Sequence, residues 1–530
     1  MSRETWRTAA GFAGMIRQFA SPSVVPDAMT TGTDNPTTRA IGTTSSLFDA
    51  LNRAGVRYCH FKSNAHLVAG LEGLTDLDVL CDRQQVELTA QILARHGFRR
   101  FPAHPSRGYL GVEDYFGIDE HTGRLLHLHL HYRLIVGERF FKNYRLPWES
   151  EFLETRVFDE SAGVFVADPA LEWLLLVCRA ALKIRWRDRV LAVVAPRRGE
   201  SGAMRGEHSW LAGRVDRNVP QAHAEQLLDA GTSELVGLAL ADNLAFGRLK
   251  RLRRKLLHSE KVFRGYRRIP ALGVRWSREL RWTVGTVIRR YLRRPFPYSR
   301  SAPGGGTLVA VIGSDGAGKS SVSGLLYSWL TRKLDVIPIY FGSGDGQSSI
   351  LRWPLKLILE VTRGRSTSQP RDPEQRRTRD IGFARAVWAV ALAREKRSKL
   401  RKAVRARERG FIVICDRYPQ TQVDGVNDGP LLWRWRASTS GLKRALARWE
   451  DGIYTAAANV PPDVVVRLLV TPETAATRRP GDHPAELEFR TQLVRNLRFD
   501  TARFGVIDID ADADLDSVVL EVKRRLWPAL

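Results

Sequence analysis

The stretch TLVAVIGSDGAGKSS, residues 307–321, determines the architecture of the carboxyl-terminal part of this chain. It contains Gly313-Ser-Asp-Gly-Ala-Gly318-Lys319-Ser320, a full match to the phosphate-binding pattern GxxxxGK[ST]. The apolar run LVAVI before it predicts a buried strand, and SVSGLLYSWLTRKL after it predicts an amphipathic helix. Between a strand and a helix, such a glycine-rich loop can curl its backbone N–H groups around a phosphate. We therefore predict a P-loop.

The residue types in this loop predict how ATP is held. Lys319 is expected to bridge the β- and γ-phosphates, and the Ser320 hydroxyl is expected to ligate Mg²⁺. The residues expected to contact the nucleotide are Gly313, Ser314, Asp315, Gly316, Ala317, Gly318, Lys319, Ser320 and Ser321.

A second segment, GFIVICDRY, predicts a strand that ends in a charged pair. The apolar residues 411–415 are followed by Asp416 and Arg417. A carboxylate at the carboxyl end of a parallel strand can lie beside the P-loop and hold Mg²⁺ or its water shell. The adjacent arginine is suited to bind a phosphate on the acceptor side.

A third segment, VVVRLLVTPETAATRRPGDHP, predicts a strand followed by a short helix with Arg478 and Arg479. Arginines on a mobile segment can close over a phosphoryl group in transfer and neutralise its charge. The alternative interpretation is a solvated basic turn. After this segment, VIDID and SVVLEVKRRL predict the last strand and helix of a parallel α/β sheet.

These three segments, in this order and spacing, resemble the thymidylate kinase family of nucleoside monophosphate kinases. The resemblance covers about residues 306–530. It implies that Asp315 lies near the acceptor nucleotide, that Asp416 and Arg417 meet magnesium and the acceptor phosphate, and that Arg478 and Arg479 are lid arginines. It implies an ATP- and Mg²⁺-dependent kinase of nucleotide biosynthesis, with dTMP as the default acceptor.

The chain departs from this family on the acceptor side. The expected second strand VIPIYF runs into GSGDGQSS, where the family has an Arg-Glu-Pro-Gly stretch. After the Asp-Arg pair stands PQTQVDG, with Thr421 near the place of a family serine. The P-loop has Ala317 where some members have an arginine. A kinase for a sugar or another metabolite, and a regulatory ATP-binding module without a small-molecule acceptor, therefore stay open as alternatives.

The amino-terminal part predicts an α+β domain over residues 43–195. TDLDVLCD predicts a strand on which Asp76 and Asp78 share one face, as two metal-bound carboxylates would. With Lys62 and Ser63 upstream, this pattern resembles the nucleotidyltransferase-like fold of the polymerase-β type. The resemblance implies a third carboxylate on a later strand.

The expected later strand, RLLHLHLHY, has histidines in place of a carboxylate. His127, His129 and His131 alternate with leucines, so they share one face of a strand. A metal site on this face and a simply packed or solvated face are both compatible with the pattern. Catalysis in this domain, as nucleotidyl transfer, is a third functional alternative, and a degenerate domain is the expectation.

Positive charge is concentrated in one segment. The 530-residue chain has a formal net charge of +26, and residues 248–300 contain 18 Lys or Arg against two Glu, a net charge of +16. We expect a basic helical linker over residues 196–303, in which Trp276, Trp282 and Tyr291 recur near helical spacing. A solvated linker and an anionic membrane surface are the two leading interpretations. Nucleic acid is less favoured, because no reading motif accompanies the charge.

The remaining expectations concern the whole chain. Residues 1–42 predict a disordered leader, and the P-loop domain is expected over residues 304–530. Four scattered cysteines without a CxxC pair favour reduced thiols in a cytoplasmic protein, peripheral to a membrane at most. No apolar run is long enough to span a bilayer, and no signal peptide is recognisable. A homodimer is compatible with the sequence.

Overall fold

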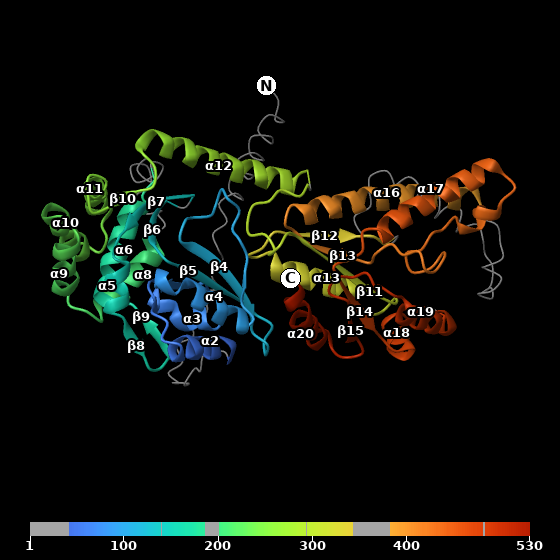
Figure 1. The fold of residues 1–530 in the computed structure, drawn as a ribbon, viewed down its shortest axis with the longest axis horizontal. Coiled ribbons are helices and arrows are strands. Elements are labelled where there is room, and N and C mark those ends of the chain that lie inside the picture. Colours follow the sequence, from blue (N-terminus) through green and yellow to red (C-terminus); the bar gives the residue numbers. More distant parts are fainter. Residues whose placement is uncertain (1–41, 139, 186–200, 293, 343–381, 481–482) are drawn as a thin grey trace, which may run out of the picture. The chain divides into compact units, whose positions relative to one another are not determined.

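The structure, a computed structural model, describes residues 42–138, 140–185, 201–292, 294–342, 382–480 and 483–530 (Figure 1). The expected leader lies outside these ranges except for Gly42, where the first described helix begins. Residues of GSGDGQSS beyond Gly342 also lie outside them. The described chain has the predicted α/β class: a mixed sheet and a small antiparallel sheet precede a parallel sheet.

The amino-terminal part is built on a mixed sheet whose described strands follow the order β3-β4-β5-β2-β1-β9-β8. Strands β2 and β5 are parallel, whereas β4 pairs with β5 in antiparallel register. The strands are β1 (Tyr58–His60), β2 (Leu77–Cys81), β3 (Arg99–Arg100), β4 (Val112–Ile118), β5 (Leu125–His131), β8 (Val157–Asp159) and β9 (Val164–Val166).

Strand β5 confirms the strict alternation expected for RLLHLHLHY. Leu126, Leu128 and Leu130 enter a core formed with α2 (Gly42–Arg53) and α4 (Val86–Arg95). Burying a leucine stabilises the fold by about 1.5–3 kcal/mol, so a one-residue slip that exposed all three would be costly. The leucines therefore hold the intervening histidines on the opposite face of the sheet. Short helices α3 (Leu67–Leu71) and α5 (Glu149–Glu154) complete this region.

A second core surrounds α6 (Pro169–Lys183), which is buried on nearly every side. Asp168 caps this helix by accepting from the N–H groups of Ala170 and Leu171. The helices packed around it are α8 (Ser201–Ala212), α9 (Asn218–Leu227), α10 (Ala230–Ala241) and α11 (Phe246–Leu256).

This packing differs from the basic helical linker expected over residues 196–303. Helix α11 is rich in arginine and lysine, but Leu249, Leu252 and Leu256 form a stripe at helical spacing that joins the core around α6. Arg253 is also buried, and its guanidinium donates to the Leu182 carbonyl at 2.6 Å. A count of charged residues does not reveal this leucine stripe. Buried residues of α8, α9, α10 and α11 all belong to the core around α6, so these helices are part of the amino-terminal core.

Helix α12 (Arg268–Arg290) follows and packs on an antiparallel sheet of β6 (Leu134–Glu138), β7 (Phe141–Leu146) and β10 (Phe263–Arg264). The glycine-rich segment SAPGGG that follows, residues 301–306, is packed against the carboxyl-terminal part of the chain. Ala302 is buried and its N–H donates to the Gly410 carbonyl at 3.0 Å. Gly306 lies so close to the backbone of Arg407 that a Cβ there would meet its carbonyl oxygen at 2.2 Å.

The carboxyl-terminal part is a parallel sheet with strand order β12-β13-β11-β14-β15. All pairings between neighbouring strands are parallel. The strands are β11 (Thr307–Gly313), β12 (Val336–Tyr340), β13 (Ile412–Asp416), β14 (Val464–Leu469) and β15 (Val506–Asp510), as the apolar segments predicted.

Helices cover both faces of this sheet, because its central strands are apolar at successive positions. On β11, Val309 and Val311 face a core that includes α13 (Lys319–Leu330) and α20 (Leu515–Leu526). Leu308 and Ala310 face the opposite core, which includes α16 (Phe383–Glu408) and α19 (Pro484–Asn496). The remaining helices are α17 (Gly441–Ala458) and α18 (Pro472–Arg478).

Candidate active site

The central strand β11 places the P-loop at a change of direction in the sheet. It pairs with β13 on one side and with β14 on the other. The chain runs from β11 to β12 and β13 on one side, and then crosses from β13 to β14 and β15 on the other. In open α/β sheets the crevice beyond the carboxyl ends of strands at such a point is the usual ligand site. The predicted loop runs from the end of β11 at Gly313 into α13, which begins at Lys319.

Two glycines give the loop its curvature. Gly316 and Gly318 have φ angles of +86° and +81°, a region that side chains with a Cβ rarely adopt. Gly316 is also held close to α18, because a Cβ there would lie 3.1 Å from the Ala475 carbonyl oxygen. The loop thus lies against the backbone of the helix predicted to hold the lid arginines.

The structure brings Lys319, Ser320 and Asp416 together. Lys319 is buried, and its Nζ donates to the Ser314 carbonyl at 2.6 Å. Ser320 Oγ donates to Asp416 Oδ2 at 2.6 Å. Burial, together with the nearby Arg417, lowers the pKa of Lys319 to about 8. The predicted partnership of the P-loop with the carboxylate that ends β13 is therefore present in the geometry.

The oxygen atoms beside the loop fit a magnesium ion. Asp416 Oδ1 and Ser314 Oγ are buried and have no hydrogen-bond partner among the described residues. A buried carboxylate oxygen without a partner is costly, and Mg²⁺ or one of its waters would satisfy it. The Ser320 hydroxyl and the Asp416 carboxylate are hard oxygen ligands of the kind that Mg²⁺ prefers. Ser321 is exposed at the start of α13.

Arg417 and Asp315 form the other half of the site. Arg417 Nη2 donates to Asp315 Oδ1 at 2.9 Å, and Arg490 from α19 pairs with the second oxygen of the same carboxylate. Burial by itself would raise the pKa of Asp315, but Lys319, Arg417 and Arg490 lower it to about 2. Arg417 has a φ of +70°, an unusual backbone conformation for a residue with a Cβ.

The structure places Arg478 and Arg479 at the end of α18, and both are exposed. Arg478 Nη1 donates to the Ala511 carbonyl at 2.8 Å, and Nη2 lies 3.3 Å from the Ala513 carbonyl. Its guanidinium is therefore bound to the segment after β15 and not to the P-loop. Arg490, which sequence reasoning missed, makes the contact with the P-loop carboxylate instead.

A small pocket opens between the P-loop and the segment after β13. Gly313, Lys319, Arg417 and Asp428 are among its polar lining, and Val494, Leu497 and Phe499 form an apolar side. Asp428 Oδ2 lies 3.6 Å from Arg417 Nη1, and Asp428 Oδ1 lies 3.4 Å from the buried Lys396 ammonium. The pocket therefore lies on the Arg417 side of the candidate site.

The segment PQTQVDG forms one wall of this pocket through Gln420. The Gln420 Nε2 group donates to the carbonyls of Val423 and Val426 at 2.8 and 3.0 Å, and Gln420 Oε1 accepts from the Val423 N–H. Thr421 is exposed and does not line the pocket. Neither Arg490 nor Asp428 lies in a recognisable motif, so only the folded chain identifies them.

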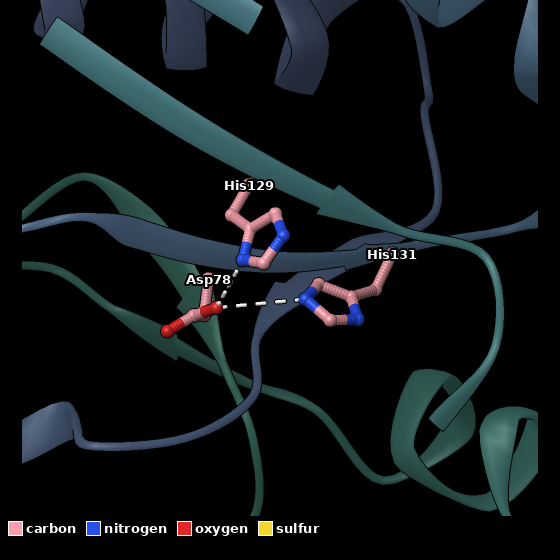
Figure 2. A group of neighbouring side chains, drawn as sticks. All are labelled: Asp78, His129 and His131. Carbon is pink, nitrogen blue, oxygen red and sulfur yellow. Dashed lines mark hydrogen bonds and ion pairs between the residues drawn. The ribbon is translucent and has the colours of Figure 1, made fainter. Parts of the chain in front are cut away.

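The amino-terminal sheet brings a second group of charged residues together. The strand register sets Asp78 on β2 beside His129 on β5, and His129 beside Asp114 on β4. His129 Nδ1 lies 3.2 Å from Asp78 Oδ1, and His131 Nε2 lies 3.5 Å from the same oxygen. Figure 2 shows the two histidine rings and the Asp78 carboxylate directed toward one another.

His127 has different partners. Its Nε2 lies 2.9 Å from Asp114 Oδ1, and its Nδ1 lies 2.9 Å from Asp76 Oδ1. The resemblance implied a third carboxylate on a later strand; the carboxylate that contacts His127 is Asp114, which lies on the neighbouring strand β4. Burial alone would raise the pKa of Asp114, but the hydrogen bond from His127 lowers it below its usual range. In the sequence, the alternating pattern VEDYF was the signal that could have identified this strand and its aspartate.

Cations surround this face as well. Lys62 Nζ lies 2.8 Å from Asp78 Oδ1, and Ser63 beside it has a left-handed φ of 58°. Burial, together with the nearby Lys62, lowers the pKa of the Lys142 ammonium from 10.5 to about 7. The predicted residues Lys62, Asp76, Asp78 and the histidine row are thus brought into one region of the sheet.

Comparison with known proteins finds sequence relatives for the carboxyl-terminal part. An uncharacterized ATP-binding protein, YghR of Escherichia coli K12, is 28% identical over 223 residues, which are 41% of this chain and 86% of that protein. The uncharacterized ATP-binding protein YghS of the same strain is 26% identical over 231 residues, covering 42% of this chain and 93% of that protein. No protein-family model matches the chain.

Among solved structures, a deoxyadenosine kinase from M. mycoides with bound dATP aligns with 41% of this chain and 98% of its own, at 16% identity and a TM-score of 0.24. A thymidylate kinase from Ehrlichia chaffeensis aligns with 42% of this chain and 98% of its own, at 17% identity and a TM-score of 0.23. TM-scores at this level do not bear on what the chain does.

Among the described helices, none combines the length and the apolar character needed to cross a bilayer.

Proposed function

We propose that the P-loop domain binds ATP with Mg²⁺ and transfers the terminal phosphoryl group to a small acceptor that bears a phosphate. The single observation that supports this most is the contact of Ser320 Oγ with Asp416 Oδ2 at 2.6 Å, with Asp416 Oδ1 buried and lacking a hydrogen bond from any described residue. This arrangement lies at the carboxyl ends of β11 and β13, beside the loop that surrounds phosphate.

On the donor side, the loop amides and the Lys319 ammonium bind the phosphates of ATP. Ser320 and Asp416 would hold Mg²⁺, which neutralises charge on the β- and γ-phosphates as the transfer proceeds. Asp416 sits at a strand end that is fixed by pairing with β11 and β12, so its carboxylate is held in place before the nucleotide arrives. The printed names of YghR and YghS, as ATP-binding proteins, support this donor half.

On the acceptor side, Arg417 is the residue that we assign to the acceptor phosphate. Its guanidinium is held between Asp315 and Asp428, and it lines the same pocket as Lys319. An acceptor phosphate that binds there lies near the terminal phosphate of ATP, and binding both in one pocket supplies the proximity that phosphoryl transfer requires. A guanidinium binds a phosphate in bidentate geometry, which favours a phosphate-bearing acceptor over a neutral sugar.

The default acceptor is dTMP, and Arg478 and Arg479 are assigned to a lid that closes over the transferring group. Closure would require Arg478 to leave the carbonyls of Ala511 and Ala513. Arg490 is already paired with Asp315 and supplies a further cation at the P-loop. A kinase for a sugar or another metabolite, and a regulatory ATPase, are the competing assignments.

The test is ADP formation by the purified full-length chain with ATP and Mg²⁺. The acceptor panel contains nucleoside monophosphates, nucleosides, sugar phosphates and free sugars, alongside a reaction without acceptor. We expect ADP formation to rise at least about tenfold with one class of phosphate-bearing acceptor. Lys319→Ala should abolish this activity, whereas Lys250→Ala, which removes an exposed lysine of α11, should not.

A second variant separates the donor half from the acceptor half. Arg417→Ala should raise the KM for the acceptor while leaving the Kd for ATP nearly unchanged. Slow ADP formation that is the same with every acceptor and with none would refute the kinase and favour a regulatory ATPase. A response to a neutral sugar alone, insensitive to Arg417→Ala, would refute the assignment of Arg417 to an acceptor phosphate.

A further inference from the structure

The amino-terminal sheet holds a histidine–aspartate cluster that lies outside the P-loop site and has no role in the proposed kinase. Its members are Asp76, Asp78, Asp114, His127, His129 and His131. We propose that Asp78, His129 and His131 bind one divalent transition-metal ion. Asp78 lies on β2, and both histidines lie on β5, where the strand register sets Asp78 beside His129 (Figure 2). The three side chains converge from two strands that hydrogen bonds and buried leucines hold in register.

The spacing of the ligand atoms fits a metal ion. One potential ligand atom from each residue lies within 4.8 Å of the others. Asp78 Oδ1 is 3.2 Å from His129 Nδ1 and 3.5 Å from His131 Nε2. Around a tetrahedral ion with bonds of about 2.0–2.2 Å, neighbouring ligand atoms are about 3.3–3.6 Å apart. The separation to His131 lies within this range, and the separation to His129 is about 0.1 Å shorter.

His131 gives an independent indication of a ligand. Only 1% of this residue is exposed, and neither ring nitrogen makes a hydrogen bond to a described residue. Its Nε2 faces the Asp78 carboxylate at 3.5 Å, which is longer than a good hydrogen bond. A buried imidazole without hydrogen bonds is destabilising, and coordination of a metal would satisfy the nitrogen that faces Asp78.

The residue types select the class of metal. Two imidazoles and one carboxylate suit zinc, iron or cobalt in the divalent state, whereas Mg²⁺ and Ca²⁺ prefer oxygen ligands alone. Three protein ligands leave a coordination position open for water or another ligand. His129 Nε2 lies 3.6 Å from Asp114 Oδ1, the position in which a carboxylate orients a metal-bound imidazole.

Lys62 competes with the metal for Asp78. Its Nζ lies 2.8 Å from the same Oδ1 that faces both histidines, so binding of a cation requires this ammonium to turn away. We therefore expect Lys62→Met to tighten metal binding, because it removes the competing charge while keeping a side chain of similar length. This effect distinguishes a site at Asp78 from adventitious binding elsewhere on the chain.

The experiment uses the full-length chain, freed of metal by a chelator and then equilibrated with Zn²⁺ or Co²⁺. We expect one bound metal per chain by elemental analysis, and visible absorption bands of low-coordinate Co²⁺ in the cobalt form. His131→Ala and Asp78→Asn should each lose the bound metal. His127→Gln is the matched control: it lies on the same strand and face but contacts Asp76 and Asp114, so it should retain the metal.

Thermal unfolding separates loss of the metal site from loss of the fold. Zn²⁺ should raise the Tm of the wild-type chain, and Asp78→Asn should remove this rise while still unfolding cooperatively. Metal retained by both Asp78→Asn and His131→Ala would overturn the proposal, as would a wild-type chain that binds no Zn²⁺ or Co²⁺. Weakened metal binding in Lys62→Met would overturn the assigned position of the site.

Helix α12 presents a second feature, which is independent of the metal cluster: a row of its apolar side chains faces outward. Ile269, Trp276 and Leu280 are 84%, 59% and 64% exposed, and the exposed stripe continues along the helix through Leu272, Val284, Val287 and Tyr291. Their spacing of three or four residues places them on one side of the helix.

The basic side of α12 is turned toward the protein. Arg275 pairs with Glu138 at 3.0 Å, Arg278 stacks 4.9 Å from the ring centre of Tyr109, and Arg281 Nη2 lies 2.8 Å from His104 Nε2. These contacts fix the rotation of the helix, so the apolar stripe cannot turn inward. An exposed apolar stripe of this length marks an interaction surface.

We infer that this face of α12 binds the surface of an anionic lipid bilayer. Exposed cations flank the stripe at both ends: Lys261, Arg264 and Arg267 before the helix and Arg294 after it. Tryptophan and tyrosine within the stripe suit the headgroup region of a bilayer. A second copy of the chain would bring two segments of net charge +16 together, which disfavours a dimer through this face.

Vesicle co-sedimentation tests this surface with phosphatidylcholine vesicles, with and without phosphatidylglycerol. We expect binding to the anionic vesicles that weakens with salt, and its loss in Trp276→Ser/Leu280→Ser. Leu442→Ser is the matched control, because Leu442 is an exposed leucine on α17. Absence of binding to anionic vesicles would overturn the inference, as would a dimer in light scattering that Trp276→Ser/Leu280→Ser converts to a monomer.

Discussion

The P-loop site and the histidine–aspartate cluster hold carboxylates and cations by different means. In the P-loop, the donor-side groups come from eight consecutive residues and one strand end, and glycine conformations set their positions. In the cluster, Asp78, Asp114 and His129 come from three strands, and their meeting depends on how those strands pair. A contiguous motif can be recognised in a sequence, whereas a row of residues across a sheet depends on register.

The two sites also differ in the groups that surround their buried lysines. Lys319 has a carbonyl acceptor at 2.6 Å and the Asp315 carboxylate at 3.8 Å. The pKa of the Lys142 ammonium is lower than that of Lys319, mainly because of burial and also because Lys62 and Arg179 lie nearby. The ammonium of Lys319 thus has a carbonyl acceptor and a nearby carboxylate, whereas the ammonium of Lys142 lies in a buried environment close to two other cations.

The largest expected effect tests whether the two sites act independently. Asp416→Asn should lower ADP formation by about 10²- to 10³-fold, because it removes the carboxylate charge that we propose holds Mg²⁺. Asp78→Asn, the same change in the amino-terminal sheet, should leave ADP formation within about twofold of wild type. Steady-state rates at saturating ATP measure both, and an equal loss in the two variants would show that the sites are coupled.

A pH series of unfolding free energies sharpens the comparison of the two lysines. The pKa of Lys142 is about 7 in the folded chain against an ordinary 10.5, so the unfolded chain binds more protons between these values. Wild-type stability therefore rises with pH through this window. Lys142→Met should be more stable than wild type by about 1 kcal/mol or more near pH 6, and the gain should vanish toward pH 10.5.

Lys319→Met provides the comparison for that series. The pKa of Lys319 in the folded chain is about 8. The substitution should therefore stabilise the chain less than Lys142→Met does, and its effect should vanish over the narrower window from about pH 8 to 10.5. Denaturant unfolding at each pH measures both variants. A gain for Lys142→Met that does not depend on pH would mean that packing, and not charge, is responsible.

The smallest effect concerns the contact between the P-loop and α18. Gly316→Ala and Gly318→Ala each impose a positive φ on alanine, which costs about 1–2 kcal/mol. Only Gly316→Ala adds a Cβ within 3.2 Å of the Ala475 backbone, whereas the space beside Gly318 is open. Gly316→Ala should therefore be less stable by about a further 1 kcal/mol in thermal unfolding without nucleotide. Equal losses would show that α18 moves aside freely.

Much of the fold could be predicted because each element has its own signal. The apolar strands before Gly313 and Asp416 and the alternating leucines of β5 all appear where their patterns indicated. The helices around α6 were misjudged, because the arginines of α11 obscured its leucine stripe. Which leucines are buried depends on the elements that they pack against, and amino-acid composition does not identify those elements.

The sequence by itself determined the P-loop and its Asp-Arg strand end, since short-range geometry follows from glycine, lysine and an apolar strand in a set order. It also placed three histidines on one face. Folding alone added Arg490 to the P-loop carboxylate, Asp114 to the histidine row and the outward rotation of α12. These depend on contacts between segments distant in the chain, because strand register and helix packing result from the burial of the whole core.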